Sequence, residues 1–292
     1  HLAERIGTPS LVVCLDSWAP DESRLWLTTS LRGLIQARLR VDVLTEGVHS
    51  GQAGGVVPSS FRIVRHLLDR VEDPATGTIR LGELQGPIPY ERRHQAIEAV
   101  AAGVDVAGEM PWAGRAPDAD PVEQLLDSTW CPSLSITGVG GAPAPHVAGN
   151  VQRAHTEVAL SIRLHPETDP DRAREVLEEA LTTDLPPEAI VTLDVQASEA
   201  GWAAPETADW LATALDDAST SVFGAPPGAV GVGGTIPFMA MLGHRFPAAQ
   251  FVITGVLVPG SNAHGPNEFL HVPTGRRVTA AVARLLDAHA AR

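Results

Sequence analysis

The pattern of apolar and polar positions along the chain predicts two kinds of β-strand. Residues 11–15 form a continuous apolar run and residues 251–257 a nearly continuous one. Such runs are typical of strands buried on both faces, as in a parallel sheet covered by helices. Residues 37–44, 156–164 and 189–195 instead alternate apolar and polar positions. This alternation is typical of strands with one solvated face, which are common in antiparallel sheets.

Helical spacing accompanies these strands. Residues 58–70 and 169–181 carry apolar side chains three and four positions apart, and the second segment opens on an Asp-Pro pair that suits a helix start. Residues 133–136 are strand-like, so the middle of the chain runs strand, helix, strand, strand, helix, strand. This order predicts a split βαβ, ferredoxin-like layer. Further helices are expected at residues 206–223 and 274–290.

These patterns predict an α/β protein with two domains. One domain has a mixed, mostly parallel sheet with flanking helices and is made of residues 1–34 and 202–292. The other, residues 35–201, is an inserted antiparallel α+β layer. Residues 72–128 are rich in Pro, Gly, Ala and acidic side chains, and we interpret them as an insertion of loops and helices within the second domain.

The composition narrows the expected partners and location. The 35 acidic residues exceed the 21 basic ones, for a formal net charge of -14, and an acidic surface repels nucleic-acid phosphates and anionic membranes. No apolar run reaches the ~20 residues of a spanning helix, and the first residues lack the pattern of a signal peptide. Cys14 and Cys131 lie far apart in apolar contexts, which fits reduced thiols. We therefore expect a cytoplasmic protein without nucleic-acid or membrane partners.

Four short segments carry residues that could do chemistry. Asp16 follows the first buried strand, where a carboxylate could bind a metal or cap a helix. His49 lies between glycines, on a backbone that could approach a ligand or form an ordinary exposed loop. Gly234 and Thr235 belong to a Gly-rich turn whose N–H groups could bind an anion. His264 follows the second buried strand and could be a metal ligand or part of a capped loop.

The combination of these segments resembles the di-zinc aminoacylase/carnosinase family of metallopeptidases, which includes cytosolic nonspecific dipeptidases. The matching motifs are Asp-Ser-Trp at 16–18, His-Ser-Gly at 49–51, Asn-Val at 150–151, Ser-Ile-Arg at 161–163, Gly-Gly-Thr-Ile-Pro at 233–237 and Asn-Ala-His-Gly-Pro-Asn-Glu at 262–268. The resemblance covers essentially the whole chain, and it is the order and spacing of all the motifs that make it specific. It implies the C-terminal part of a zinc-peptidase catalytic domain, with an inserted lid or dimerisation domain.

The resemblance implies a metal centre of which this chain holds a part. Asp16 would be a terminal ligand of one zinc ion, and His264 a terminal ligand of a second. In the family a His-x-Asp pair and a Glu-Glu pair supply the other ligands and the general base, ahead of the strand that ends at Asp16. The residues before Asp16 contain neither pair. Because a catalytic zinc needs about three protein ligands, we expect this chain alone to bind zinc poorly and not to catalyse.

The resemblance also implies roles for residues of the lid. His49 would reach the active site of a partner subunit and stabilise the oxyanion formed on the substrate, and Asn150 would contact substrate there too. Arg163 would grip the substrate carboxylate, a task that suits its forked donors. Gly234 and Thr235 would hold the same end of the substrate. A lid that acts on a partner's site implies a homodimer through this domain.

The function expected from this resemblance is hydrolysis of dipeptides or related small amides by a di-zinc exopeptidase. One alternative is an amidohydrolase of the same family that acts on N-acyl or N-succinyl amino acids. Another is a non-catalytic dimerisation or binding module, since half of the metal ligands are absent. The family often has Arg-Glu before the Gly-Gly turn, where this chain has Gly231 and Val232, so we expect a different side-chain specificity.

Overall fold

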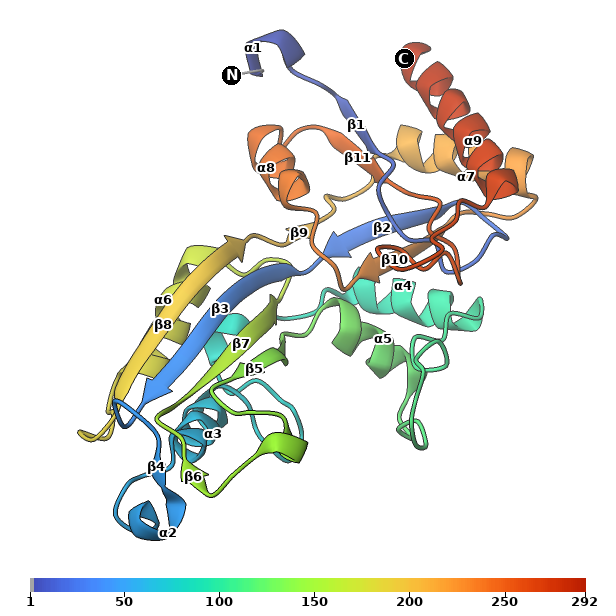
Figure 1. The fold of residues 1–292 in the computed structure, drawn as a ribbon. Coiled ribbons are helices and arrows are strands. Elements are labelled where there is room, and N and C mark those ends of the chain that lie inside the picture. The colour runs from blue at the N-terminus through green and yellow to red at the C-terminus, as the bar shows by residue number, and fades with distance from the viewer. Residues whose placement is uncertain (1–2) are drawn as a thin grey trace. The chain divides into compact units, whose positions relative to one another are not determined.

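The computed structural model describes residues 3–292, which form two compact units (Figure 1). The first unit contains the chain up to Leu31 together with Pro87–Trp130 and Trp202–Arg292. The second unit contains Arg32–Gly86 and Cys131–Gly201. The first boundary thus falls after Leu31, earlier than the boundary after residue 34 that the sequence predicts.

One segment differs from the domain division expected from the sequence. We expected residues 87–130 within the second domain, but the structure places Pro87–Trp130 in the first unit. The reason is packing: α4 (Tyr90–Ala101) and α5 (Pro121–Thr129) share one buried apolar cluster with Trp26 and Val230. The segment is therefore an extension of the first unit's core.

The two long apolar runs of the first unit pair as parallel strands. β1 (Leu11–Cys14) and β11 (Gln250–Ile253) form a two-stranded parallel sheet. A second sheet has the order β10-β2-β9, in which β10 is parallel and β9 antiparallel to β2. Its strands are β2 (Trp26–Leu31), β9 (Trp202–Ala203) and β10 (Gly228–Val232). This mixture confirms the mixed α/β character expected from the sequence.

Helices supply most of the apolar side chains that cover these strands. Besides α4 and α5, the helices of this unit are α1 (Ala3–Ile6), α7 (Asp209–Phe223), α8 (Pro237–Arg245) and α9 (Val272–Ala290). Leu215 of α7 and Leu285 of α9 are buried with Val252 of β11. Met239 of α8 is buried with Cys14 at the end of β1. Within residues 3–292, no helix combines the length and apolar character needed to cross a membrane.

The second unit is an antiparallel four-stranded sheet with the order β5-β7-β3-β8. Along the chain its elements run β3, α3, β5, β7, α6, β8, which is the split βαβ arrangement predicted from the alternating segments (Figure 1). Their bounds are β3 (Gly33–Asp42), α3 (Ser60–Val71), β5 (Ser133–Gly140), β7 (His155–Leu164), α6 (Pro170–Thr182) and β8 (Ile190–Glu199). The smaller elements are β4 (Val48–His49), α2 (Ser50–Ala53), the 3-10 helices η1 (Gly82–Leu84) and η2 (Pro145–Val147), and β6 (Val151–Gln152).

This sheet has one buried face and one polar face. Ile35 and Leu39 of β3 are buried with Leu67 of α3 and Leu177 of α6. The intervening position Arg38 is exposed, because successive side chains of a strand point to opposite faces. The helices therefore cover one face of the sheet, and charged side chains gather on the other.

Candidate functional site

Asp16 lies two residues beyond the carboxyl end of β1, the first strand of the first unit's parallel sheet. Beyond the regular strands, the N–H group of Thr254 donates to the carbonyl oxygen of Cys14 at 2.9 Å, so the two chains stay paired. Gly255 then passes so close to Ser17 that an added Cβ would lie 1.7 Å from the Ser17 carbonyl oxygen. Asp16 is exposed beside this contact. The position matches the sequence prediction, since ligand-binding residues of open α/β sheets follow the carboxyl ends of strands.

His264 lies in the loop that follows β11, and this loop is built by its own hydrogen bonds. Asn262, His264 and Asn267 have positive φ angles of 53°, 62° and 59°. The Asn262 side-chain amide donates to the carbonyl oxygen of Pro266 at 2.6 Å, and the N–H group of His264 donates to Glu268 Oε2 at 3.3 Å. Glu268 thus contacts the backbone of His264, and the imidazole itself is exposed.

These residues do not make a zinc site by themselves. Among residues 3–292, the structure brings together no group of three or more His, Cys, Asp or Glu side chains that could hold a metal ion. A catalytic zinc is held by three protein ligands and water or substrate. Asp16 and His264 stay predicted ligands, and the donors among the described residues do not fit a complete centre.

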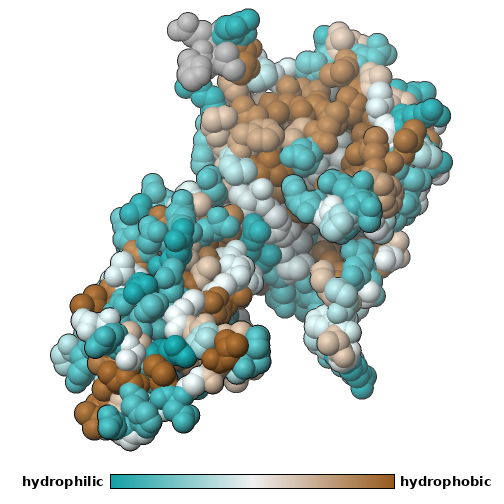
Figure 2. All heavy atoms as spheres, viewed as in Figure 1, coloured by the Kyte–Doolittle hydropathy of each residue, from teal (hydrophilic) through white to brown (hydrophobic). Residues whose placement is uncertain are grey.

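The surface around Asp16 is unusually apolar. A groove of about 480 Å³ beside it is lined by Leu15, Leu270 and Val272, of which Leu15 is 54% and Leu270 58% exposed. Figure 2 shows a broad hydrophobic area on the first unit. Close by, the buried hydroxyl of Thr254 has no hydrogen-bond partner among the described residues. Exposed apolar area of this kind marks an interaction surface, and a buried hydroxyl is normally satisfied.

The Gly-rich turn that contains Gly234 and Thr235 connects the end of β10 to the start of α8. Both residues are half-buried. A Cβ on Gly234 would meet only the Val232 side chain, at 3.7 Å, so the backbone here is not crowded. The turn therefore has the strand-to-helix placement that the sequence suggested for an anion-binding backbone.

The structure brings His49 and Asn150 together in the second unit. β4 and β6 pair antiparallel with His49 opposite Val151, and the N–H group of Ser50 donates to the Asn150 carbonyl oxygen at 3.0 Å. His49 Nδ1 accepts from the N–H group of Gly51 at 3.2 Å. In the neutral ring the proton is then on Nε2, which makes Nε2 a donor. Both side chains are exposed and lie beside the short antiparallel pair of β4 and β6.

Arg163 has a second arginine beside it that the sequence interpretation did not single out. Arg163 lies on β7 opposite Leu34 of β3 and Ser133 of β5. Arg32 Nη1 donates to the Cys131 carbonyl oxygen at 3.0 Å and to Ser133 Oγ at 3.2 Å. Burial lowers the pKa of Arg163. The pKa of Arg32 is lowered to about 10, mainly by burial and to a smaller extent by the nearby charge of Arg163. Both guanidinium groups remain charged at neutral pH.

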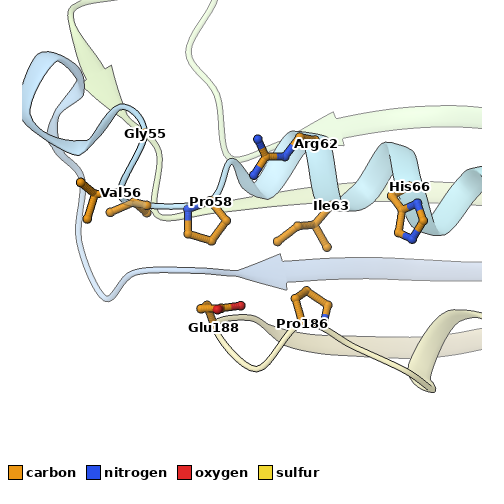
Figure 3. Close-up of a pocket in the computed structure, with 9 residues that line it drawn as sticks. Gly55, Val56, Pro58, Arg62, Ile63, His66, Pro186 and Glu188 are labelled. Carbon is orange, nitrogen blue, oxygen red and sulfur yellow. The ribbon is translucent and has the colours of Figure 1, made fainter.

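A pocket of about 590 Å³ lies elsewhere on the second unit, between the start of α3 and the connection from α6 to β8 (Figure 3). Arg62 and His66 of α3 line it from one side, and Pro186 and Glu188 from the other. The predicted site residues of this unit are not among its lining residues. It is therefore separate from the features described above.

Comparison with known proteins identifies a dimerisation domain in the middle of the chain. The family model described as "Peptidase dimerisation domain", M20_dimer, matches residues 29–189. This range contains Arg32, His49, Asn150 and Arg163, whereas Asp16 and His264 lie outside it. A curated relative, cysteinylglycine-S-conjugate dipeptidase of Corynebacterium striatum, is 29% identical over 83% of this chain and 52% of its own length.

Solved structures share the fold over nearly the whole chain. The dipeptidase Dug1p of Saccharomyces cerevisiae has a TM-score of 0.72 and 21% identity, over 94% of this chain and 59% of its own. Human carnosine dipeptidase 1 has a TM-score of 0.71 and 22% identity, over 95% of this chain and 59% of its own. The metallo-carboxypeptidase Sso-CP2 of Sulfolobus solfataricus has a TM-score of 0.75 and 16% identity, over 95% of this chain and 63% of its own.

These relatives are considerably longer than the chain. The chain spans about half of the curated relative, 52%, and 59% of two of the solved structures. The family model, in contrast, matches more than half of this chain, at residues 29–189. The resemblance expected from the motifs is confirmed: the chain belongs to the M20 peptidase family.

Proposed function

We propose that the chain is the lid and part of the catalytic domain of a metal-dependent exopeptidase that hydrolyses dipeptides or related small amides. The observation that carries this proposal is the pairing of β4 with β6, which sets the exposed His49 beside Asn150 although the two are far apart in sequence. Similarity to a cysteinylglycine-S-conjugate dipeptidase and to carnosine dipeptidase 1 supports a peptide substrate.

The chemistry of the second unit suits a substrate with a free carboxylate. Arg163 is a half-buried cation on the polar face of the sheet, where its charge is less screened than at a fully exposed site. His49 offers Nε2–H as a donor to an oxyanion. We also assign Gly234 and Thr235 a role in holding a substrate carboxylate through the Gly-rich turn. In a homodimer, a carboxylate anchor from one subunit and an oxyanion donor from its partner would favour cleavage near a chain end.

The metal centre would need ligands beyond those this chain supplies. We assign Asp16 and His264 as one terminal ligand each of two zinc ions. The remaining donors would come from polypeptide outside these residues, which fits the greater length of the relatives. The apolar groove beside Asp16 and the unsatisfied hydroxyl of Thr254 support further polypeptide packing at this edge. The chain by itself would then be inactive.

A homodimer through the second unit completes the proposal. The match to a peptidase dimerisation domain supports this assembly. His49 and Asn150 would then act in the active site of the partner subunit, in agreement with their exposure in a single chain. We place the enzyme in the cytoplasm because Cys14 and Cys131 lie far apart in the sequence in apolar contexts, which fits reduced thiols.

Two alternatives remain testable. An amidohydrolase of the same family would use the same residues on N-acyl or N-succinyl amino acids. A non-catalytic dimerisation or binding module is favoured by the absence of a three-ligand group within residues 3–292. The gene sequence upstream of residue 1 distinguishes the enzyme from the non-catalytic module. An in-frame His-x-Asp pair and Glu-Glu pair there would supply the other metal ligands and the general base of the enzyme.

The substrate class can be tested with the full product of the gene that encodes this chain. The enzyme is supplied with zinc and offered dipeptides, the same dipeptides as C-terminal amides, and N-acyl and N-succinyl amino acids. We expect the highest kcat/KM for dipeptides with a free carboxylate, and a rise in KM for the amides because Arg163 loses its ion pair. Preference for N-acyl amino acids would support the amidohydrolase. Hydrolysis of none of them would support the non-catalytic module.

A further inference from the structure

Arg32 is placed by the fold so that its side chain crosses a neighbouring strand. It precedes β3, whereas its hydrogen-bond acceptors, the Cys131 carbonyl oxygen and Ser133 Oγ, are at the start of β5. In the sheet order β5-β7-β3-β8, β7 lies between these two strands. The guanidinium group of Arg32 must therefore extend over the end of β7, which carries Arg163.

The register of the strands puts Arg163 beside this crossing. Arg163 is opposite Ser133 on β5 and opposite Leu34 on β3, so the Ser133 that Arg32 contacts is the direct cross-strand neighbour of Arg163. Directly opposite residues have Cβ atoms about 5 Å apart and point to the same face. Arg32, Ser133 and Arg163 thus gather at one end of the polar face.

Because the guanidinium groups of Arg32 and Arg163 are both positively charged, an anion bound beside them would be stabilised by both charges. The charge of Arg163 disfavours the charged form of Arg32, and both groups have lost part of their hydration through burial. An anion between the two guanidinium groups relieves this repulsion and accepts forked hydrogen bonds from both. A carboxylate, with two oxygens and about four lone-pair sites, matches that donor set.

We infer that Arg32 and Arg163 form one anion site, in which a carboxylate is bound by two guanidinium groups and not by Arg163 alone. The identity of the anion as the C-terminal carboxylate of a peptide rests on the proposed function. The existence of the anion site does not. The hydrogen bonds of Arg32 to Cys131 and Ser133 also link the start of β3 to the start of β5. Arg32 therefore contributes a positive charge to the site and also helps to hold the strands that carry it.

The test uses this chain, with sodium acetate, glycylglycine and glycylglycinamide as probes at constant ionic strength. The side-chain Nε–H resonances of arginine are followed by NMR during each titration. We expect the resonances of Arg32 and Arg163 to shift together with acetate and with glycylglycine, giving one dissociation constant, and to shift little with the amide. A shift of Arg163 alone would overturn the two-arginine site.

Three variants separate anion binding from a structural role. Arg32→Gln should weaken acetate binding by about tenfold or more, since a hydrogen bond to a charged group is lost along with its charge. Arg32→Lys keeps the charge and a donor for the Cys131 carbonyl, so it should bind acetate more tightly than Arg32→Gln. Arg38→Gln, an exposed arginine farther along the same face of β3, is the matched control and should bind as the parent does.

The outcomes decide between distinct conclusions. Equal acetate affinity of Arg32→Gln and the parent, with an unchanged melting temperature, would overturn the proposal. Loss of acetate binding in Arg32→Gln with retention in Arg38→Gln would support it. If acetate binds through both arginines but glycylglycine binds no better than its amide, the anion site stands and the dipeptidase assignment fails.

Discussion

Gly255 and Ser17 lie so close together that a methyl group on Gly255 would be 1.7 Å from the carbonyl oxygen of Ser17. The contact joins the two chains just beyond the regular β1–β11 pairing, where Thr254 also donates to Cys14. Asp16 lies immediately before Ser17, so its position depends on this approach of two backbones. Only a residue without a Cβ allows that approach without moving the segment that carries Asp16.

Substitution of Gly255 by alanine should therefore destabilise the first unit. The methyl group has to displace backbone, and we expect the free energy of unfolding to fall by about 1–3 kcal/mol, as for other overpacked sites. Urea unfolding measures this change. Gly114→Ala is the control, because an added Cβ there meets nothing within 4 Å and the residue is exposed. Equal stability of the two variants would mean that the Gly255 contact is not tight in solution.

A substitution at Thr254 can show whether further polypeptide packs beside the end of β11 in the full gene product. Its hydroxyl is buried and lacks a partner among the described residues, so Thr254→Val should stabilise this chain by about 1 kcal/mol or more. In the full gene product the same change should be neutral or destabilising, because a packed neighbour would use the hydroxyl. Thermal unfolding of both forms measures the effect.

The matched control for that substitution is Thr28→Val. Thr28 is equally buried, but its hydroxyl is hydrogen-bonded to Ser17 Oγ at 2.5 Å. Its loss should cost about 1 kcal/mol in either form of the protein, since Ser17 is left without this partner. A stabilising Thr254→Val in the full gene product as well would argue against a packing partner at this edge.

His49 should matter for turnover and not for metal binding. In the full gene product, His49→Ala should lower kcat by about 10²–10³-fold, the effect of removing one oxyanion donor, with zinc content unchanged. Steady-state kinetics and metal analysis measure the two quantities. His66→Ala, which removes another exposed histidine of the second unit, serves as the control. Unchanged turnover in His49→Ala would contradict the oxyanion role.

The regular elements of the fold could be predicted because their patterns are local. The apolar run at 11–15 and the nearly apolar run at 251–257 became the parallel pair β1 and β11, and the alternating segments became β3, β7 and β8. The Asp-Pro pair at 169–170 does start a helix, since Asp169 accepts hydrogen bonds from the first backbone N–H groups of α6.

The features that the sequence did not predict depend on contacts between distant segments. α4 buries small alanines such as Ala96 and Ala99, which give little helical contrast, so nothing in the sequence assigned it to the first unit's core. Arg32 was missed because its significance comes from a crossing over β7 to Ser133. The ligand roles of Asp16 and His264 come from the motifs and stay predictions.

The central claim is that this chain holds the lid and the substrate-binding arginines but only part of the metal centre. The most direct measurement is zinc content after dialysis together with dipeptide hydrolysis, made on this chain and on the full gene product. We predict that the full product retains two zinc ions per subunit and hydrolyses dipeptides, whereas this chain retains well under one and does not. A chain that holds two zinc ions and cleaves dipeptides on its own would contradict the account.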